Sequence, residues 1–187
     1  MGKLYWKPGN MLYPLPVVMV SCSDKGKDNI ITCAWAGTIC SDPAMLSISV
    51  RKERFSYDMI LNSGEFVVNL VTKDLAFATD YCGVASGKDV DKFAKMNLTK
   101  LASKNVSCPS IAESPVNLEC KVKDVKHLGT HSIFMAEIVG VTVDDKYMDE
   151  SGRFNLNDSN LVAYSHGRYF TLGEELGKFG YSVKKKK

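Results

Sequence analysis

Short apolar segments of strand length, separated by turn residues, constrain the fold of this chain more than any other feature of its sequence. Residues 16–23 form a valine-rich run, and residues 30–36 form a second run after a polar, glycine-containing stretch. Residues 44–50 follow a turn at Asp42-Pro43 and alternate between apolar and small polar side chains. Such spacing favours antiparallel strands that pair through short connections.

The strand pattern continues through the rest of the chain, with a few short helices between the strands. Further strands are expected at 65–71, 116–127, 132–143 and 168–172, and the long pair is joined at Leu128-Gly129-Thr130. Helices are expected at 57–61 with Ser56 as N-cap and Gly64 as stop, at 72–81 ended by Gly83, and at 90–96 capped by Asp89. This combination predicts a mainly β protein with short helices, arranged as a Greek-key barrel.

The length and charge of the chain limit the number of domains and the kinds of partner. A chain of 187 residues fits one domain, so a single domain over 1–187 is expected. The formal net charge of +3 comes from the lysine run at 184–187, and we expect a disordered basic tail from about residue 183. The sequence has neither a basic face nor an apolar run of about 18 residues. We therefore expect no nucleic-acid partner and no membrane span.

The cysteine and histidine positions argue against a metal site or a disulfide framework. The six cysteines contain no C-x-x-C pair, and several lie inside predicted strands, where a thiol acts as a small apolar group. His127, His131 and His166 lack the i, i+4 spacing of a helical metal site. We expect free, buried thiols, no metal, and a reducing cytoplasmic location.

The first candidate binding residues lie in the stretch 29–56. Arg51 ends a predicted strand, and a predicted helix begins after Ser56. Unpaired N–H groups at a helix N-terminus and a bidentate guanidinium together suit a phosphate monoester. The alternative is an ordinary helix cap beside a solvated arginine, and the residue types leave both interpretations open. The P-loop and G-x-G-x-x-G fingerprints are both absent.

Other residues could contact a flat ligand with polar edges. Trp35 could line a ring system, although a tryptophan alone more often belongs to the core. Asn29 and Thr32 could face a heteroaromatic edge or satisfy the loop. Lys92 follows the Ser86-Gly87 turn and occupies a first-turn position that the helix dipole does not favour. A bound anion, an electron-rich ring or plain surface exposure could explain this lysine.

Several segments, taken in order, carry a family resemblance. They are Pro16-Val17-Val18-Met19-Val20, residues 29–43, Ser49-Val50-Arg51 with Ser56, residues 64–70, Ser86-Gly87 with Asp91-Lys92-Phe93, residues 118–122, and Gly129-Thr130-His131 leading into 133–141. In this order and spacing, over about residues 10–180, the chain resembles the flavin reductase-like, FMN-binding split-barrel proteins, particularly the flavoredoxin branch. One departure is the single proline of Asp42-Pro43-Ala44, where many relatives carry two.

This resemblance implies a six-stranded antiparallel Greek-key split barrel that forms a homodimer and holds FMN noncovalently near the subunit interface. It implies the following cofactor-binding residues: Thr32, Cys33, Ala34 and Trp35 along the isoalloxazine, Asn29 at a polar edge, Ser49, Val50, Arg51 and Ser56 at the ribityl chain and phosphate, and Ser86, Gly87 and Lys92 closing the pocket. Lys92 would lie near the polar edge of the ring, as a catalytic residue, or near the phosphate. The segment 161–180 would pack over the flavin of its own or the partner subunit.

Three functions are compatible with the resemblance. The chain could be an NAD(P)H-dependent flavin or ferric reductase, or an electron carrier that exchanges electrons with a redox protein partner. It could also be a nonenzymatic flavin- or haem-binding module on the same barrel. A fold alone does not separate these functions, so all three stay open. The resemblance favours an oxidoreductase that passes electrons from NAD(P)H or a protein donor through FMN to an acceptor.

Overall fold

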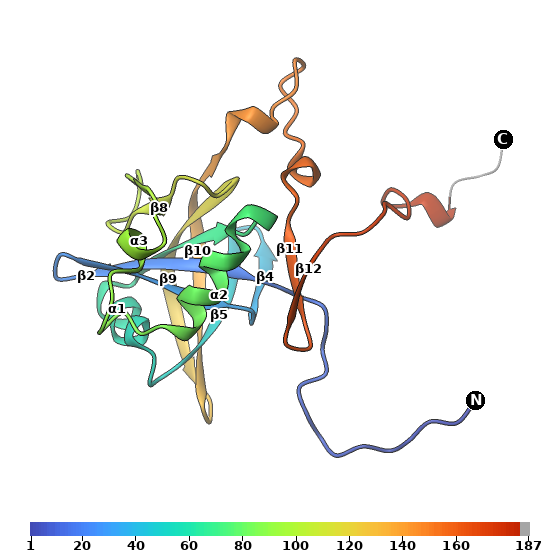
Figure 1. The fold of residues 1–187 in the computed structure, drawn as a ribbon, viewed down its shortest axis with the longest axis horizontal. Coiled ribbons are helices and arrows are strands. Elements are labelled where there is room, and N and C mark those ends of the chain that lie inside the picture. Colours follow the sequence, from blue (N-terminus) through green and yellow to red (C-terminus); the bar gives the residue numbers. More distant parts are fainter. Residues whose placement is uncertain (184–187) are drawn as a thin grey trace.

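An antiparallel sheet of seven strands, rolled into a barrel, forms the centre of the molecule (Figure 1). The computed structural model describes residues 1–183, so the predicted lysine tail at 184–187 lies outside the described residues. The strand order is β3-β2-β6-β9-β10-β5-β4, and two small sheets, β1-β11-β12 and β7-β8, accompany it. The mainly β, antiparallel split-barrel class is thus confirmed, with seven strands in the main sheet rather than six.

The elements follow one another along the chain with short connections. The strands are β1 (Leu15–Pro16), β2 (Val18–Asp24), β3 (Lys27–Cys33), β4 (Ala36–Ser41), β5 (Ala44–Arg51), β6 (Glu65–Leu70), β7 (Lys100–Leu101), β8 (Ser110–Ile111), β9 (Val116–His127), β10 (His131–Val143), β11 (Val162–Ser165) and β12 (Arg168–Thr171). The helices are α1 (Phe55–Ser63), α2 (Ala76–Val84) and α3 (Lys92–Lys95), with short 3₁₀ turns η1 (Lys73–Leu75), η2 (Asp145–Tyr147), η3 (Leu156–Ser159) and η4 (Tyr181–Val183).

The expected strands are present, and the largest difference lies in the segment 30–36. The polar loop expected before it is a tight turn, because Lys25 and Gly26 both adopt positive φ angles, 49° and 76°. The run itself is not one strand, since β3 ends at Cys33 and β4 begins at Ala36. The two residues at this break leave the strand pattern, and they line the binding pocket described below.

The helix boundaries differ from those expected. Helix α1 begins two residues earlier than predicted, with Arg54 as N-cap, so Ser56 is not the cap but lies inside the first turn. Helix α2 continues through Gly83 rather than ending there. Helix α3 is short, and its cap is Asp91, whose carboxylate accepts a hydrogen bond from the N–H of Ala94 at 3.2 Å, rather than Asp89.

The prediction that α1 stops at Gly64 is confirmed. Gly64 adopts the left-handed conformation at φ 68°, and its N–H donates to the carbonyl of Ile60 at 2.9 Å. Glycine accepts this conformation without the steric cost that a Cβ would bring.

Two apolar clusters fill the molecule. One lies inside the barrel and includes Phe66 and Phe134, both fully buried. The other lies between the sheet and the helices α2 and α3, where Met19 and Ile30 pack against Phe93. The second cluster holds α2 and α3 on the outer face of the sheet, beside β3.

The two ends of the described chain project from the body (Figure 1). The first residues and the segment after β12 leave on the same side of the barrel and expose large apolar side chains, including Trp6, Leu12, Leu176 and Phe179. In the described part of the chain, no helix has both the length and the apolar character needed to cross a membrane.

Candidate functional site

Two adjoining pockets lie at one end of the barrel, where β3, β5 and β10 meet the start of α1 and the end of α2. The larger has a volume of about 450 Å³, and the smaller has about 130 Å³. Ile31 and Arg54 line both pockets. A single elongated ligand could therefore occupy both, with its bulky part in the larger pocket.

The inner wall of the larger pocket comes from the break between β3 and β4 and from the end of β5. It includes seven of the predicted residues: Thr32, Cys33, Ala34, Trp35, Ser49, Val50 and Arg51. In β5, Leu46, Ile48 and Val50 are buried, whereas Ser49 and Arg51 occupy the alternate positions. The N–H of Ser49 donates to the carbonyl of Trp35 at 2.8 Å, which joins the two segments.

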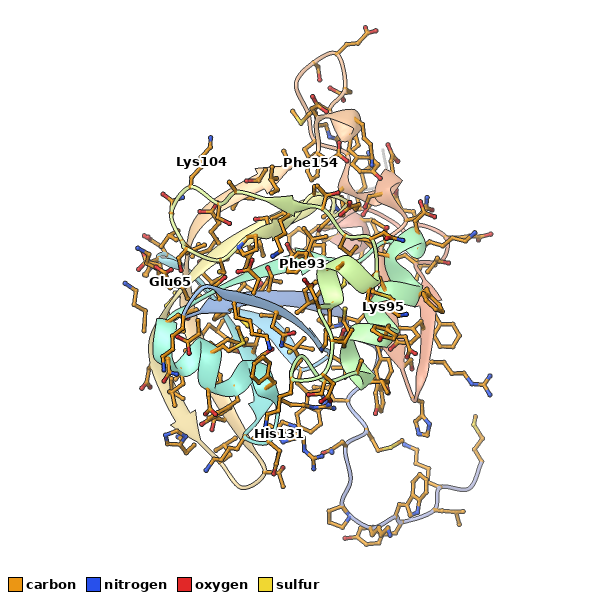
Figure 2. All side chains as sticks on the ribbon, turned by 60° about the vertical axis from the view of Figure 1, so that its left-hand side comes forward. Glu65, Phe93, Lys95, Lys104, His131 and Phe154 are labelled. Carbon is orange, nitrogen blue, oxygen red and sulfur yellow. The ribbon has the colours of Figure 1, made fainter. Side chains whose placement is uncertain are left out.

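A stacked pair of rings and an arginine form one side of this pocket. The centroids of Trp35 and His131 lie 4.6 Å apart, with an interplanar angle of 34°. His131 begins β10 and pairs with Arg51 of β5, and it lies at the opposite end of the barrel from Lys104 and Phe154 (Figure 2). Burial, and then the charge of Arg51, lower the pKa of His131, so its imidazole is neutral at pH 7.

Aromatic residues from both ends of the chain form the outer wall. Tyr13 precedes β1, and Tyr164 and Tyr169 belong to the hairpin β11–β12. The hydroxyl of Tyr169 donates to Asp80 of α2 at 3.0 Å, which ties the hairpin to the helix across the pocket. Burial and this carboxylate raise the pKa of Tyr169 to about 12, so the phenol keeps its proton.

The smaller pocket lies against the first turn of α1. The amide of Asn29 donates to the hydroxyl of Ser56 at 2.8 Å, and both side chains are buried. Gly87 approaches Asn29 so closely that a Cβ on Gly87 would lie 2.2 Å from Oδ1 of Asn29. The turn at Ser86 and Gly87 can close this pocket only because residue 87 has no side chain.

Lys92 lies in the smaller pocket and is almost completely buried. Its ammonium donates to the carbonyls of Ile30 and Cys82, each at 2.7 Å, and so joins β3 to the end of α2. The Cys82 carbonyl belongs to the last turn of α2, where backbone acceptors lack helical partners. Burial lowers the pKa of Lys92. An ammonium has three donors, so one remains for a ligand.

Cys33, which lines the larger pocket, is not a reactive thiolate at neutral pH. Burial raises the pKa of Cys33 to about 12, so its thiol is protonated at neutral pH. All six cysteines are free, as the sequence predicts.

The structure divides the predicted site residues between the two pockets. Arg51 and Ser56, which the sequence combined in one phosphate site, line different pockets. Lys92 lines the smaller pocket and is absent from the lining of the larger one, where Trp35 lies. Sequence reasoning missed Arg54, which lines both pockets together with Ile31, because only the true start of α1 reveals it.

The outer wall was also missed. Tyr13, His131, Tyr164 and Tyr169 come from distant parts of the chain, and no local motif connects them. The resemblance placed the segment 161–180 over the flavin, but it did not indicate that Tyr164 and Tyr169 are the residues of this segment that line the pocket.

With this geometry in view, the comparisons with known proteins agree on one family. The model of the flavin reductase like domain matches residues 10–173. An uncharacterised protein of Archaeoglobus fulgidus is 34% identical over 160 residues, which cover 86% of this chain and 89% of that protein.

Two solved structures have the same fold over nearly the whole chain. A flavoredoxin of Desulfovibrio vulgaris (Miyazaki F) has a TM-score of 0.89 and 29% identity, covering 98% of this chain and 100% of that one. A flavoredoxin from Methanosarcina acetivorans has a TM-score of 0.88 and 27% identity, with the same coverage. The chain belongs to the flavin reductase-like family, and it is similar to the flavoredoxins within it.

Proposed function

We propose that this chain is an oxidoreductase that holds FMN noncovalently, with the isoalloxazine in the larger pocket and the phosphate in the smaller one. The observation that carries the proposal is the pair of adjoining pockets, one aromatic and one cationic, joined through Arg54. The larger volume, about 450 Å³, is within the usual range for small-molecule sites.

The smaller pocket has the donor set that a phosphate monoester needs. Arg54 and Lys92 supply positive charge, and Ser56 supplies a hydroxyl at the first turn of α1. The start of this helix adds free N–H groups and the positive end of its dipole. We therefore assign Lys92 to the phosphate end of the cofactor, and Arg54 takes the role that the sequence gave to Arg51.

In this proposal the protein binds and orients the cofactor, and the cofactor supplies hydride and electron transfer. NAD(P)H or a protein donor would deliver two electrons, and an acceptor would remove them. Neutral His131 and protonated Tyr169 would add no charge beside the ring, so Arg51, Arg54 and Asp80 supply the charges of the larger pocket. The similarity to two flavoredoxins supports an electron-carrying role as much as a reductase.

The first experiment compares FMN with riboflavin, which lacks the phosphate. Fluorescence titration should give an FMN dissociation constant that rises at least tenfold in Arg54→Ala, because a charge-assisted contact contributes about 1.5–3 kcal/mol. Riboflavin affinity should change little. Lys52→Ala, which removes a neighbouring exposed cation, is the matched control. Equal losses for both ligands would contradict the phosphate assignment.

A second experiment separates reductase from carrier. The FMN-loaded protein is mixed anaerobically with NADH or NADPH, and the loss of yellow colour is followed. Rapid bleaching with turnover of added FMN supports a reductase, whereas bleaching only by a reduced protein donor supports a carrier. A protein that does not bind FMN at all would refute both.

We further propose that the chain is a single-domain, cytoplasmic homodimer. The projecting ends, with Trp6 and Phe179 exposed, carry apolar surface that a second copy could cover. Continuous pairing across the seven-stranded sheet supports one domain, and the six free cysteines suit a reducing compartment. Analytical ultracentrifugation should give twice the mass of the 20.7 kDa chain; a monomer at micromolar concentration would contradict the dimer.

A further inference from the structure

One cation of the larger pocket is not used by the proposed cofactor site. Arg51 ends β5, is exposed, and lines the larger pocket but not the smaller one. Within residues 1–183, none of the four ion pairs includes Arg51. The phosphate would be bound by Arg54, Lys92 and the start of α1. The charge of Arg51 is therefore not needed for the phosphate.

The surroundings of Arg51 show where its charge acts. It pairs with His131 in the β5–β10 ladder, and His131 stacks on Trp35. Because His131 is neutral at pH 7, it does not compete with Arg51 for an anion. The charge of Glu53 acts in the opposite direction and raises the pKa of His131, but Glu53 lines the smaller pocket.

The other charged residues that line the larger pocket, Arg54 and Asp80, have other partners in the proposed site. Arg54 would be neutralised by the cofactor phosphate, according to the proposed function. Asp80 belongs to α2, on the outer wall, and accepts the hydrogen bond of Tyr169. Arg51 and the partly exposed Trp35 both line the larger pocket and both neighbour His131.

We propose that Arg51 recognises an anionic group, a phosphate or a carboxylate, on the second substrate that exchanges electrons with the bound flavin. Arginine binds such groups with two parallel hydrogen bonds, and Trp35 provides a flat surface for the rest of the molecule. The anion can belong to the donor, as in the pyrophosphate of a nicotinamide dinucleotide, or to a small acceptor. This inference rests on the proposed function.

The test compares charged and uncharged substrates of the same chemistry. For donors, NADH is compared with 1-benzyl-1,4-dihydronicotinamide, which transfers the same hydride but has no phosphate. For acceptors, two-electron reoxidation of the photoreduced protein by 1,4-benzoquinone-2-carboxylate is compared with reoxidation by 1,4-benzoquinone, which lacks the carboxylate. Arg51→Ala should slow reaction with at least one anionic substrate about tenfold at low salt, and the loss should shrink as salt rises. The uncharged substrates should react at unchanged rates.

Binding measurements and control variants separate the possible outcomes. Arg51→Ala should keep the FMN dissociation constant within twofold of the wild-type value, and calorimetry with NAD⁺ should show weaker binding if the donor carries the anion. Arg51→Lys should restore part of the charge-dependent rate, and Lys52→Ala should behave as wild type. A loss of FMN affinity as large as that of Arg54→Ala would overturn the assignment of Arg51. So would an Arg51→Ala variant whose rates with charged and uncharged substrates change by the same factor. If the wild-type protein binds no FMN, the proposed function itself fails.

Discussion

Gly87→Ala tests whether the smaller pocket depends on the close approach of two chain segments. The new Cβ would lie 2.2 Å from Oδ1, 2.5 Å from Cγ and 2.7 Å from Nδ2 of Asn29. Asn29 is only 3% exposed, so its side chain cannot turn into solvent. Either Asn29 or the turn at residue 87 must move, and a shift of Asn29 breaks its hydrogen bond to Ser56.

The expected cost follows from that buried hydrogen bond. Leaving a buried amide without its partner costs about 1–3 kcal/mol, which lowers Tm by about 2–4 °C for each kcal/mol in a chain of this size. The FMN dissociation constant should rise about tenfold or more, because Ser56 loses the partner that orients its hydroxyl and 1.4 kcal/mol corresponds to a factor of ten. Thermal unfolding and FMN fluorescence titration measure the two effects.

A double-mutant cycle identifies the cause. In Asn29→Ala/Gly87→Ala the clash disappears, so adding the Gly87 change to Asn29→Ala should cost less than about 0.5 kcal/mol, a coupling energy of about 1–3 kcal/mol. Gly37→Ala is the matched control, because a Cβ there meets nothing within 4 Å. The reasoning is refuted if Gly87→Ala is as stable as Gly37→Ala, or if the two changes of the cycle simply add.

Three further perturbations test other parts of the structure. Tyr169→Phe removes the hydrogen bond to Asp80, so FMN should dissociate about fivefold faster in stopped-flow displacement, since a bond of about 1 kcal/mol is lost; Tyr164→Phe is the control, and equal rates would contradict the role of the bond. Lys92→Met leaves two buried carbonyls without a donor and should cost about 2–4 kcal/mol in urea unfolding, and an unchanged stability would show that water replaces the ammonium. Burial raises the pKa of Cys120 from 9.0 to about 12, so its stabilising effect is present below pH 9 and is lost as pH rises toward 12. Between pH 7 and pH 10, Cys120→Ala should therefore lose about 1.4 kcal/mol less stability than wild type, and parallel pH curves would contradict the raised pKa.

Local sequence signals were sufficient where neighbours in the chain decide the structure. The alternation in 44–50 predicted β5, and Gly64 predicted the end of α1, because each depends on a few consecutive residues. The cap of α1 was predicted wrongly at Ser56. A serine before an apolar run resembles a cap, but the hydroxyl of Ser56 instead accepts a hydrogen bond from Asn29 of β3.

The order of apolar and polar residues, by itself, determined that this chain forms antiparallel strands with short helices, because strand alternation and turn chemistry are local properties. Specific motifs in the sequence resemble the flavin reductase-like family, and that resemblance indicated most residues of the inner pocket wall. Only the tertiary structure decided which side chains share a pocket. It placed Arg51 and Ser56 in different pockets. It also buried Lys92 between two carbonyls and brought Tyr169 within hydrogen-bond distance of Asp80. Those contacts join segments far apart in the chain, and their distances are set by the packing of the whole barrel rather than by any local pattern.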